Sequence, residues 1–428
     1  MRDRVRLAVL TGVAFLVAAC GGGPVENTID EAPSLAPLVQ ERALWDVTSA
    51  PAIGTVGEAS LIGDTAVISG NERDGFRLAV VDAATGMPHW GIGYLDPLPG
   101  GGGAVYFRPG NAEPGFLVAG PPEDFLVLVP YYRDDCEHPT GWCPREDGEP
   151  YRAEEGVAAL SGKDGSVRWM GPVVPFGEAG DTAIALRDVG ENLLLVETRD
   201  MNATPGSLHT VALRLSDGQE LWRHPGVEGR ISTAGTVLVR RPTDLAEAVL
   251  LGHPFADGTV TGLDAASGHR RWDLQERFSN SDAELVAGDL VVVRTSRDGA
   301  ESTRVLDAAS GREVAHLGNP LTCGSDTRSL IACVDPLDHT LSTFQIDDRE
   351  VRVSGREVRP ISISGVWRGR VFLSDAFTVG DPARRAVVDR SGNVLADRLP
   401  GHLLAISDRY AIFRTTDDGN ISVHAVTP

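Results

Sequence analysis

The chain has 428 residues, with 39 basic and 60 acidic side chains and a formal charge of −21. So acidic a composition argues against nucleic acid as a partner, because binding a phosphate backbone needs clustered positive charge. An apolar fraction of 42% excludes a wholly disordered chain, and 49 glycines with 27 prolines favour many tight turns over long helices.

The N-terminus has the layout of a secretory signal peptide. Three arginines within the first six residues precede an apolar run over 7–17, which is too short to span a bilayer as a mature helix. The following Ala-Ala-Cys resembles a bacterial lipobox, in which the peptidase cuts before a lipidated cysteine. We therefore expect a lipoprotein signal peptide over 1–19 and lipidation at Cys20, whose acyl chains hold the protein at the membrane. The alternative is an ordinary signal peptide with a chance cysteine.

Residues 20–42 are rich in Gly, Pro and acidic side chains and bury too little apolar surface to fold, which predicts a flexible tether. The folded body then covers 43–428 as a single domain. No other apolar run approaches the ~18 residues of a transmembrane helix. The expected location is the extracytoplasmic face of a cell membrane, held by lipid.

The four remaining cysteines are an even number, which suits two disulfides outside the cytoplasm. Short sequence separations favour Cys136 with Cys143 and Cys323 with Cys333. His138 lies beside the first pair and raises a metal site as an alternative, but no C-x-x-C spacing supports it. We predict two local disulfides and no metal.

An internal repeat predicts the fold. Each copy has a strand, a tight turn ending in glycine and a second strand. The copies cover residues 80–90, 158–169, 212–222, 262–272, 305–315, 343–353 and 387–396. In the first four a tryptophan lies four residues after the glycine: Gly86 and Trp90, Gly165 and Trp169, Gly218 and Trp222, Gly268 and Trp272. Two more short strands precede each copy, such as 283–287 and 290–294. Four antiparallel strands every 40–50 residues, roughly, are typical of a propeller blade.

The two ends of the chain supply one further blade. Residues 402–426 read as three strands, and 42–47 supply the fourth, with Trp45 at the tryptophan position. We therefore predict an all-β, eight-bladed propeller of four-stranded antiparallel blades. Pairing of the N-terminal strand with the last blade would remove an exposed sheet edge.

The D-A-A-[TS]-G-x-x-x-W pattern at 82–90 and 264–272 resembles the tryptophan-docking repeat of quinoprotein-like (PQQ-like) propellers. The layout is similar to the eight-bladed lipoproteins of the outer-membrane β-barrel assembly machine. The resemblance implies that the motif tryptophans and Trp45 dock between blades near the turn glycines, while Ala315 and Ala396 depart from it. Trp142 and Trp367 lie outside the motif. Trp142 is our candidate surface contact, with a buried plug beneath its loop as the alternative.

Quinone-dependent dehydrogenases share this repeat, but the resemblance implies adjacent cysteines and a calcium site, and no two cysteines here are adjacent. Hydrolase and zincin motifs are also absent from the sequence. We expect no catalytic residue and no cofactor, and a monomeric, non-catalytic interaction or scaffold module with protein partners at the envelope. The alternatives are a PQQ-dependent dehydrogenase and a small-ligand or glycan binder using the channel. Candidate contact loops are 95–103, 134–151 and 198–206.

Overall fold

The computed structural model separates into residues 1–32 and residues 33–428, and every residue that it describes lies in the second unit. It describes 39–427 apart from 41, 47–54, 73–74, 95, 99–104, 108–114, 135–152, 175–181, 201–208, 226, 232–234, 243–257, 275–283, 298–299, 319–321, 327, 336, 359–361, 375–384, 398 and 416–419. The predicted signal peptide, Cys20 and the 20–38 part of the tether lie outside the described residues. So do Cys136, Cys143 and Trp142. Over the described part of the chain, no helix is long and apolar enough to cross a membrane.

The described residues form eight antiparallel sheets and no helix, which confirms the predicted fold class. Blades 1 to 4 are β2 (Thr55–Ile62), β3 (Thr65–Glu72), β4 (Gly75–Asp82), β5 (Pro88–Gly93); β6 (Val105–Phe107), β7 (Leu117–Ala119), β8 (Leu126–Asp134), β9 (Ala153–Ser161), β10 (Val167–Val174); β11 (Thr182–Val189), β12 (Leu193–Asp200), β13 (His209–Arg214), β14 (Glu220–Pro225); and β15 (Val227–Ile231), β16 (Thr236–Pro242), β17 (Gly258–Asp264), β18 (Arg270–Leu274).

Blades 5 to 8 are β19 (Glu284–Ala287), β20 (Leu290–Arg297), β21 (Ala300–Asp307), β22 (Glu313–Gly318); β23 (Thr322–Ser325), β24 (Leu330–Asp335), β25 (Thr340–Gln345), β26 (Glu350–Glu357); β27 (Ser362–Trp367), β28 (Arg370–Ser374), β29 (Arg385–Asp389), β30 (Val394–Ala396); and β31 (His402–Ile406), β32 (Tyr410–Arg414), β33 (Ile421–Ala425), β1 (Trp45–Asp46).

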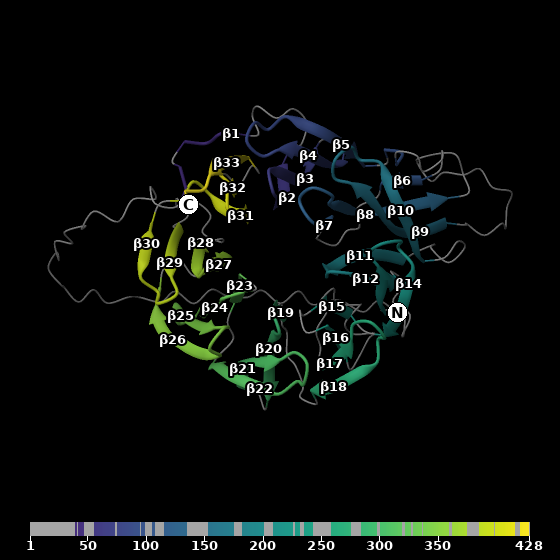
Figure 1. Ribbon diagram of the computed structural model, residues 1–428. Coiled ribbons are helices and arrows are strands. Elements are labelled where there is room, and N and C mark those ends of the chain that lie inside the picture. Colours follow the sequence, from purple (N-terminus) through teal and green to yellow (C-terminus); the bar gives the residue numbers. More distant parts are fainter. Residues whose placement is uncertain are drawn as a thin grey trace, which may run out of the picture. The chain divides into compact units, whose positions relative to one another are not determined.

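Within residues 33–428 the blades follow one another around a ring, with the first strand of each blade innermost (Figure 1). Neighbouring inner strands are in contact: β23 contacts β27, and β27 contacts β31. The second and third strands are buried on both faces, and all six residues of β24 are buried. Apolar clusters therefore lie between blades: Leu195 and Ala212 of blade 3 pack with Val237 and Leu263 of blade 4. Removing apolar surface from water contributes ~25 cal/mol per Å², so the interfaces between blades form the hydrophobic core of the propeller.

Blade 2 differs from the prediction of four strands. Its inner strand is divided into two short pieces, because β6 pairs with one end of β8 and β7 with the other. The chain between the pieces, 108–116, is longer than the register requires. The inner strand is thus interrupted by an insertion, and the sheet has five strands.

The last blade contains both ends of the described chain. Strand β1 pairs with β33, with Trp45 opposite Val423, and the Leu44 amide donates to the Val423 carbonyl at 2.7 Å. Trp45 and Val423 pack in one buried cluster with Ile68 of blade 1. Blade 8 therefore contacts blade 1 through apolar side chains as neighbouring blades do elsewhere.

The turn between the third and fourth strands has a local cause. In blade 1 the Asp82 carboxylate accepts hydrogen bonds from the Thr85 amide and hydroxyl, at 2.8 and 2.7 Å. The Thr85 hydroxyl is the main reason that the pKa of Asp82 lies below its ordinary value. Gly86 closes the turn at φ 71°, a left-handed conformation that glycine adopts without strain. The aspartate and the glycine together fix the hairpin.

Candidate functional site

The five repeat tryptophans lie at interfaces between blades. The Trp222 Nε1 donates to the Ala265 carbonyl of the next blade at 2.8 Å, and a β-carbon on Gly268 would lie 2.8 Å from the indole Cγ. The other four tryptophans make the same two contacts, a hydrogen bond to a carbonyl and packing on a glycine of the next blade. The pairs are Trp45 with Ala83 and Gly86, Trp90 with Gly162 and Gly165, Trp169 with Leu215 and Gly218, and Trp272 with Ala308 and Gly311. Each indole therefore packs on a glycine of the following blade, because the β-carbon of any other residue would collide with the ring. These aromatic side chains are occupied by interface packing.

Cys323 and Cys333 form a disulfide between β23 and β24, where the two residues are directly opposed. Cys333 is fully buried. The bond joins neighbouring strands of one blade, so it is a local clip, as predicted. The pairing of Cys136 with Cys143 stays a prediction.

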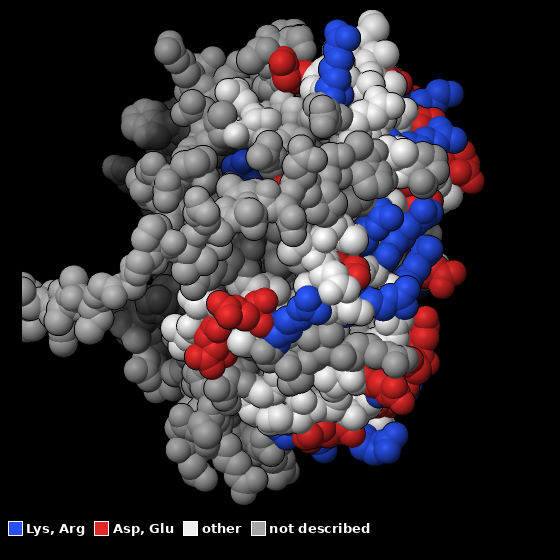
Figure 2. All heavy atoms as spheres, turned by 90° about the vertical axis from the view of Figure 1, so that its left-hand side faces the viewer, with Lys and Arg blue, Asp and Glu red and all other residues white. Residues whose placement is uncertain are grey.

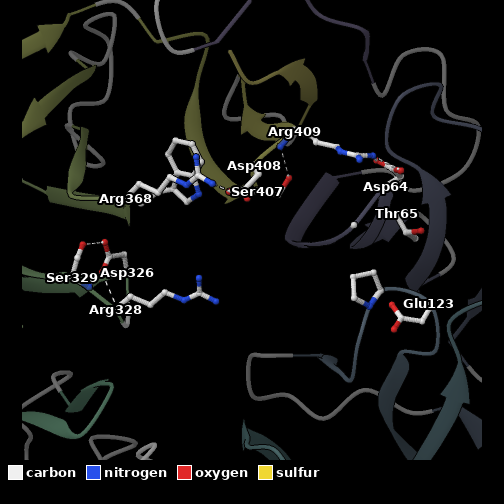
Figure 3. Close-up of a pocket in the computed structure, with 13 residues that line it drawn as sticks. Asp64, Thr65, Glu123, Asp326, Arg328, Ser329, Arg368, Ser407, Asp408 and Arg409 are labelled. Atoms are coloured by element: carbon white, nitrogen blue, oxygen red, sulfur yellow. Dashed lines mark hydrogen bonds and ion pairs between the residues drawn. The ribbon is translucent and has the colours of Figure 1, made fainter. Parts of the chain in front are cut away.

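A pocket of about 1030 Å³ lies where the turns between first and second strands meet (Figure 3). Blades 1, 2, 6, 7 and 8 line it, through residues Gly63–Thr65, Pro122 and Glu123, Asp326, Arg328 and Ser329, Trp367 and Arg368, and Ser407–Arg409. Because antiparallel strands reverse direction at each turn, these turns share one end of the ring. The pocket is thus at one mouth of the central channel.

Two ion pairs tie neighbouring blades together at this mouth. Arg409 of blade 8 binds both carboxylate oxygens of Asp64 in blade 1, at 2.6 and 2.7 Å. Arg368 of blade 7 pairs with Asp408 of blade 8 at 2.8 Å. The four side chains are largely exposed, so the pairs contribute little to stability. Their main effect is to fix the positions of the charged groups.

The third acidic group, Asp326, is satisfied by hydrogen bonds. Its carboxylate accepts from the amides of Arg328, Ser329 and Leu330, from the Ser329 hydroxyl, and from the Gly369 amide of blade 7 at 3.0 Å. Burial opposes ionisation of Asp326, but these hydrogen bonds outweigh it and lower its pKa. Asp326 therefore links the amides of Arg328, Ser329 and Leu330 to the next blade.

Trp367, the second tryptophan outside the motif, lines this pocket. Its indole is half-buried, with the guanidinium of Arg368 4.9 Å and that of Arg370 5.8 Å from the ring centroid. Burial, and then repulsion from Arg368, lower the pKa of Arg370. The blade 7 side of the mouth is aromatic and cationic.

On the face shown in Figure 2, basic and acidic side chains of the described residues lie next to one another.

Three of the four pocket carboxylates already have partners within the protein. Asp64 and Asp408 are paired with arginine, and the oxygens of Asp326 accept N–H and O–H groups. Throughout the described ranges, no three His, Cys, Asp or Glu lie together so as to hold a metal ion.

Sequence reasoning missed this pocket. It singled out the loops at 95–103, 134–151 and 198–206, most of which lie outside the described residues. A usable signal was present: the short first turns are unusually charged, as in Gly63-Asp64, Arg368-Gly369 and Asp408-Arg409. The repeat that predicts the fold lies in the turn between the third and fourth strands of each blade, whereas the pocket is formed by the turns between the first and second strands.

The chain is similar to known propeller repeats. The PQQ_2 family model, described as outer membrane protein assembly factor BamB, matches residues 209–322, from β13 to the start of β23. No curated protein matches the chain. These matched repeats and the eight-bladed fold confirm the predicted quinoprotein-like repeat.

Among solved structures, a Dos1 propeller is 8% identical, with 92% of this chain and 96% of that one covered and a TM-score of 0.52. The computationally designed Ika8 protein is 14% identical, with coverage of 87% and 97% and a TM-score of 0.50. Quinohemoprotein alcohol dehydrogenase from Comamonas testosteroni is 12% identical, with coverage of 91% and 76% and a TM-score of 0.47. At these identities the likeness concerns the fold alone.

Proposed function

We propose that the chain is a membrane-anchored extracytoplasmic lipoprotein whose propeller is a non-catalytic interaction module of the cell envelope. The observation that carries the interaction role is the pocket at the channel mouth. Five blades supply it with charged side chains on short, hydrogen-bonded turns. Loops held by a rigid scaffold are well suited to recognition, because little entropy is lost on binding.

Two further observations favour binding over catalysis. Asp64 and Asp408 are paired with two of the pocket's arginines, and Asp326 is held by hydrogen bonds, so these three carboxylates are not poised to exchange protons. The family model that matches the repeats is described as an assembly factor, which is a precedent for a propeller without enzymatic activity. A PQQ-dependent dehydrogenase and a glycan binder are the competing functions.

The anchor is tested with the full chain and a Cys20→Ala variant, expressed in a bacterium fed labelled palmitate. The full chain should take up label, sediment with membranes and be cleaved by protease added to spheroplasts. Cys20→Ala should lose the label and the membrane association. A labelled Cys20→Ala, or an unlabelled full chain, would refute lipidation at this residue.

The module role is tested by reversible cross-linking in the native host followed by purification of the full chain. A protein partner recovered in near-stoichiometric amount is expected. Purified chain supplied with quinone cofactor, calcium and alcohol or sugar substrates should not reduce an electron-accepting dye. Sustained dye reduction, or the absence of any partner, would overturn the proposal.

A further inference from the structure

Two charged side chains at the pocket differ from the rest. Arg328 and Glu123 are exposed, and neither charged group has a hydrogen bond or ion pair with any other described residue. The other ionic side chains lining the pocket are paired or hydrogen-bonded, as Arg409, Arg368 and Asp326 are. Arg328 and Glu123 are therefore the charges still available to a ligand.

These two side chains project into the pocket from opposite sides (Figure 3). Arg328 lies in blade 6, beside the Trp367, Arg368 and Arg370 group of blade 7. Glu123 lies in blade 2, on the side where blade 1 contributes Asp64. Among the described residues, the mouth thus presents one unpaired cation from blade 6 and one unpaired carboxylate from blade 2.

The backbone under each charge is fixed. Arg328 follows Asp326, whose carboxylate binds the turn and the Gly369 amide of the next blade. Glu123 lies between Pro122, which packs on Gly63 of blade 1, and Asp124, whose amide donates to Pro121 at 3.1 Å and whose carboxylate pairs with Arg168 at 3.2 Å. These contacts hold the backbone next to both charged side chains.

We propose that this mouth binds an extended polypeptide segment of a partner protein, with an acidic side chain against Arg328 and a basic side chain against Glu123. A free anion fits less well, because the lining holds four carboxylates against three arginines. The cavity is also at or above the ~300–1,000 Å³ of usual small-molecule pockets, and it is lined mainly by charged side chains. Opposite charges at separate places select a dipolar chain in one direction. This inference rests on the proposed interaction function.

The test uses fluorescence polarisation with the full chain in detergent and labelled synthetic peptides. One peptide has two aspartates at one end, a glycine–serine spacer and two lysines at the other. Its matched controls carry only aspartates or only lysines at both ends. We expect the dipolar peptide to bind about fivefold more tightly than either control, a difference that added salt should reduce.

Variants assign the binding to these residues. Arg328→Gln and Glu123→Gln should each remove most of the preference for the dipolar peptide. Arg312→Gln and Glu191→Gln, at exposed charges in turns of blades 5 and 3 outside the pocket, should leave it unchanged. The double exchange Arg328→Glu with Glu123→Arg should restore the preference that Arg328→Glu alone abolishes. Unfolding midpoints of all variants check that the fold is kept.

Equal binding of all three peptides, or a preference that survives Arg328→Gln, would overturn the inference. The native partner separates this failure from that of the proposed function. A partner that still co-purifies with the Arg328→Gln, Glu123→Gln double variant would refute this site but leave the interaction module intact. Loss of that partner from the double variant alone would support the site.

Discussion

Arg356 lies over Gly392 of the next blade, the place that an indole takes at five other interfaces. A β-carbon on Gly392 would be 2.7 Å from the Arg356 Cδ, and the guanidinium donates to the Ser391 carbonyl at 2.6 Å and the Asn393 side chain at 3.0 Å. A long aliphatic stem with a planar donor group thus reproduces both parts of the tryptophan contact, its packing and its hydrogen bond.

The preceding interface has another arginine. Arg349 replaces the turn glycine of blade 6, at φ 54°, and reaches back to Asp289 of blade 5 at 2.6 Å. Blade 5 has Ala315 where the repeat has tryptophan, so no indole requires that turn to be bare. At these two interfaces, arginine contacts therefore replace the docking of a tryptophan.

Trp222→Ala should reduce the free energy of unfolding by about 3–5 kcal/mol, because it removes a buried indole and leaves a cavity. Trp222→Phe keeps most of the apolar contact but leaves the Ala265 carbonyl without its donor, and should cost about 1–2 kcal/mol. Urea denaturation measures both. His269→Ala, exposed in the same blade as Ala265, is the control and should stay within ~0.5 kcal/mol of the wild type. Equal losses for Trp222→Ala and the control would show that the indole is not a docking group.

Gly268→Ala and Gly235→Ala form a matched pair in blade 4. Both glycines have φ near 70° (70° and 66°), so each alanine should cost about 1 kcal/mol of backbone strain. At Gly235 nothing lies within 4 Å, whereas at Gly268 the new methyl group meets Trp222. Gly268→Ala should therefore cost about 1–3 kcal/mol more.

A double-mutant cycle separates the two causes of this loss. In the Trp222→Ala background the extra cost of Gly268→Ala should fall towards that of Gly235→Ala, since the clash is gone. An unchanged cost would mean that the glycine serves the turn and not the indole.

The fold could be predicted from the sequence because one short motif specifies both a tight turn and the buried strand that precedes it. Asp82 and Gly86 specify the turn, and the alternating run before them is buried between blades, so local and tertiary signals agree. The divided inner strand of blade 2 was missed, since β6 and β7 are three residues each and carry no periodicity.

The pocket could not be predicted for a different reason. Arg328, Glu123 and Arg409 lie far apart along the chain and meet only because eight blades close into a ring. The charges of the first turns are visible in the sequence, but they do not specify which of these turns meet in one pocket. Trp367, which stands outside the repeat, was the one residue of this site that sequence reasoning set apart.

The Cys323–Cys333 disulfide closes a short loop and should contribute about 3 kcal/mol, by restricting the unfolded chain. Replacing both residues by alanine should lower the denaturation midpoint by the corresponding amount. In wild type, dithiothreitol should cause a similar loss. Any remaining response of the double alanine variant to dithiothreitol would report the predicted Cys136–Cys143 bond. A variant as stable as the wild type would contradict a stabilising role.

The turn aspartates should make stability fall in acid. Hydrogen bonding from Ser267, and then the Arg271 guanidinium, lower the pKa of Asp264 to about 2, below its ordinary value of 3.8. A lowered folded-state pKa means that the carboxylate stabilises the fold above about pH 4, and that this contribution is lost as the pH falls towards about 2. Asp264→Asn should therefore be less stable than the wild type at neutral pH and approach it near pH 2, in urea denaturation across this range. Ser267→Ala should weaken the same pH dependence in part, and a constant difference between Asp264→Asn and wild type at every pH would contradict this assignment.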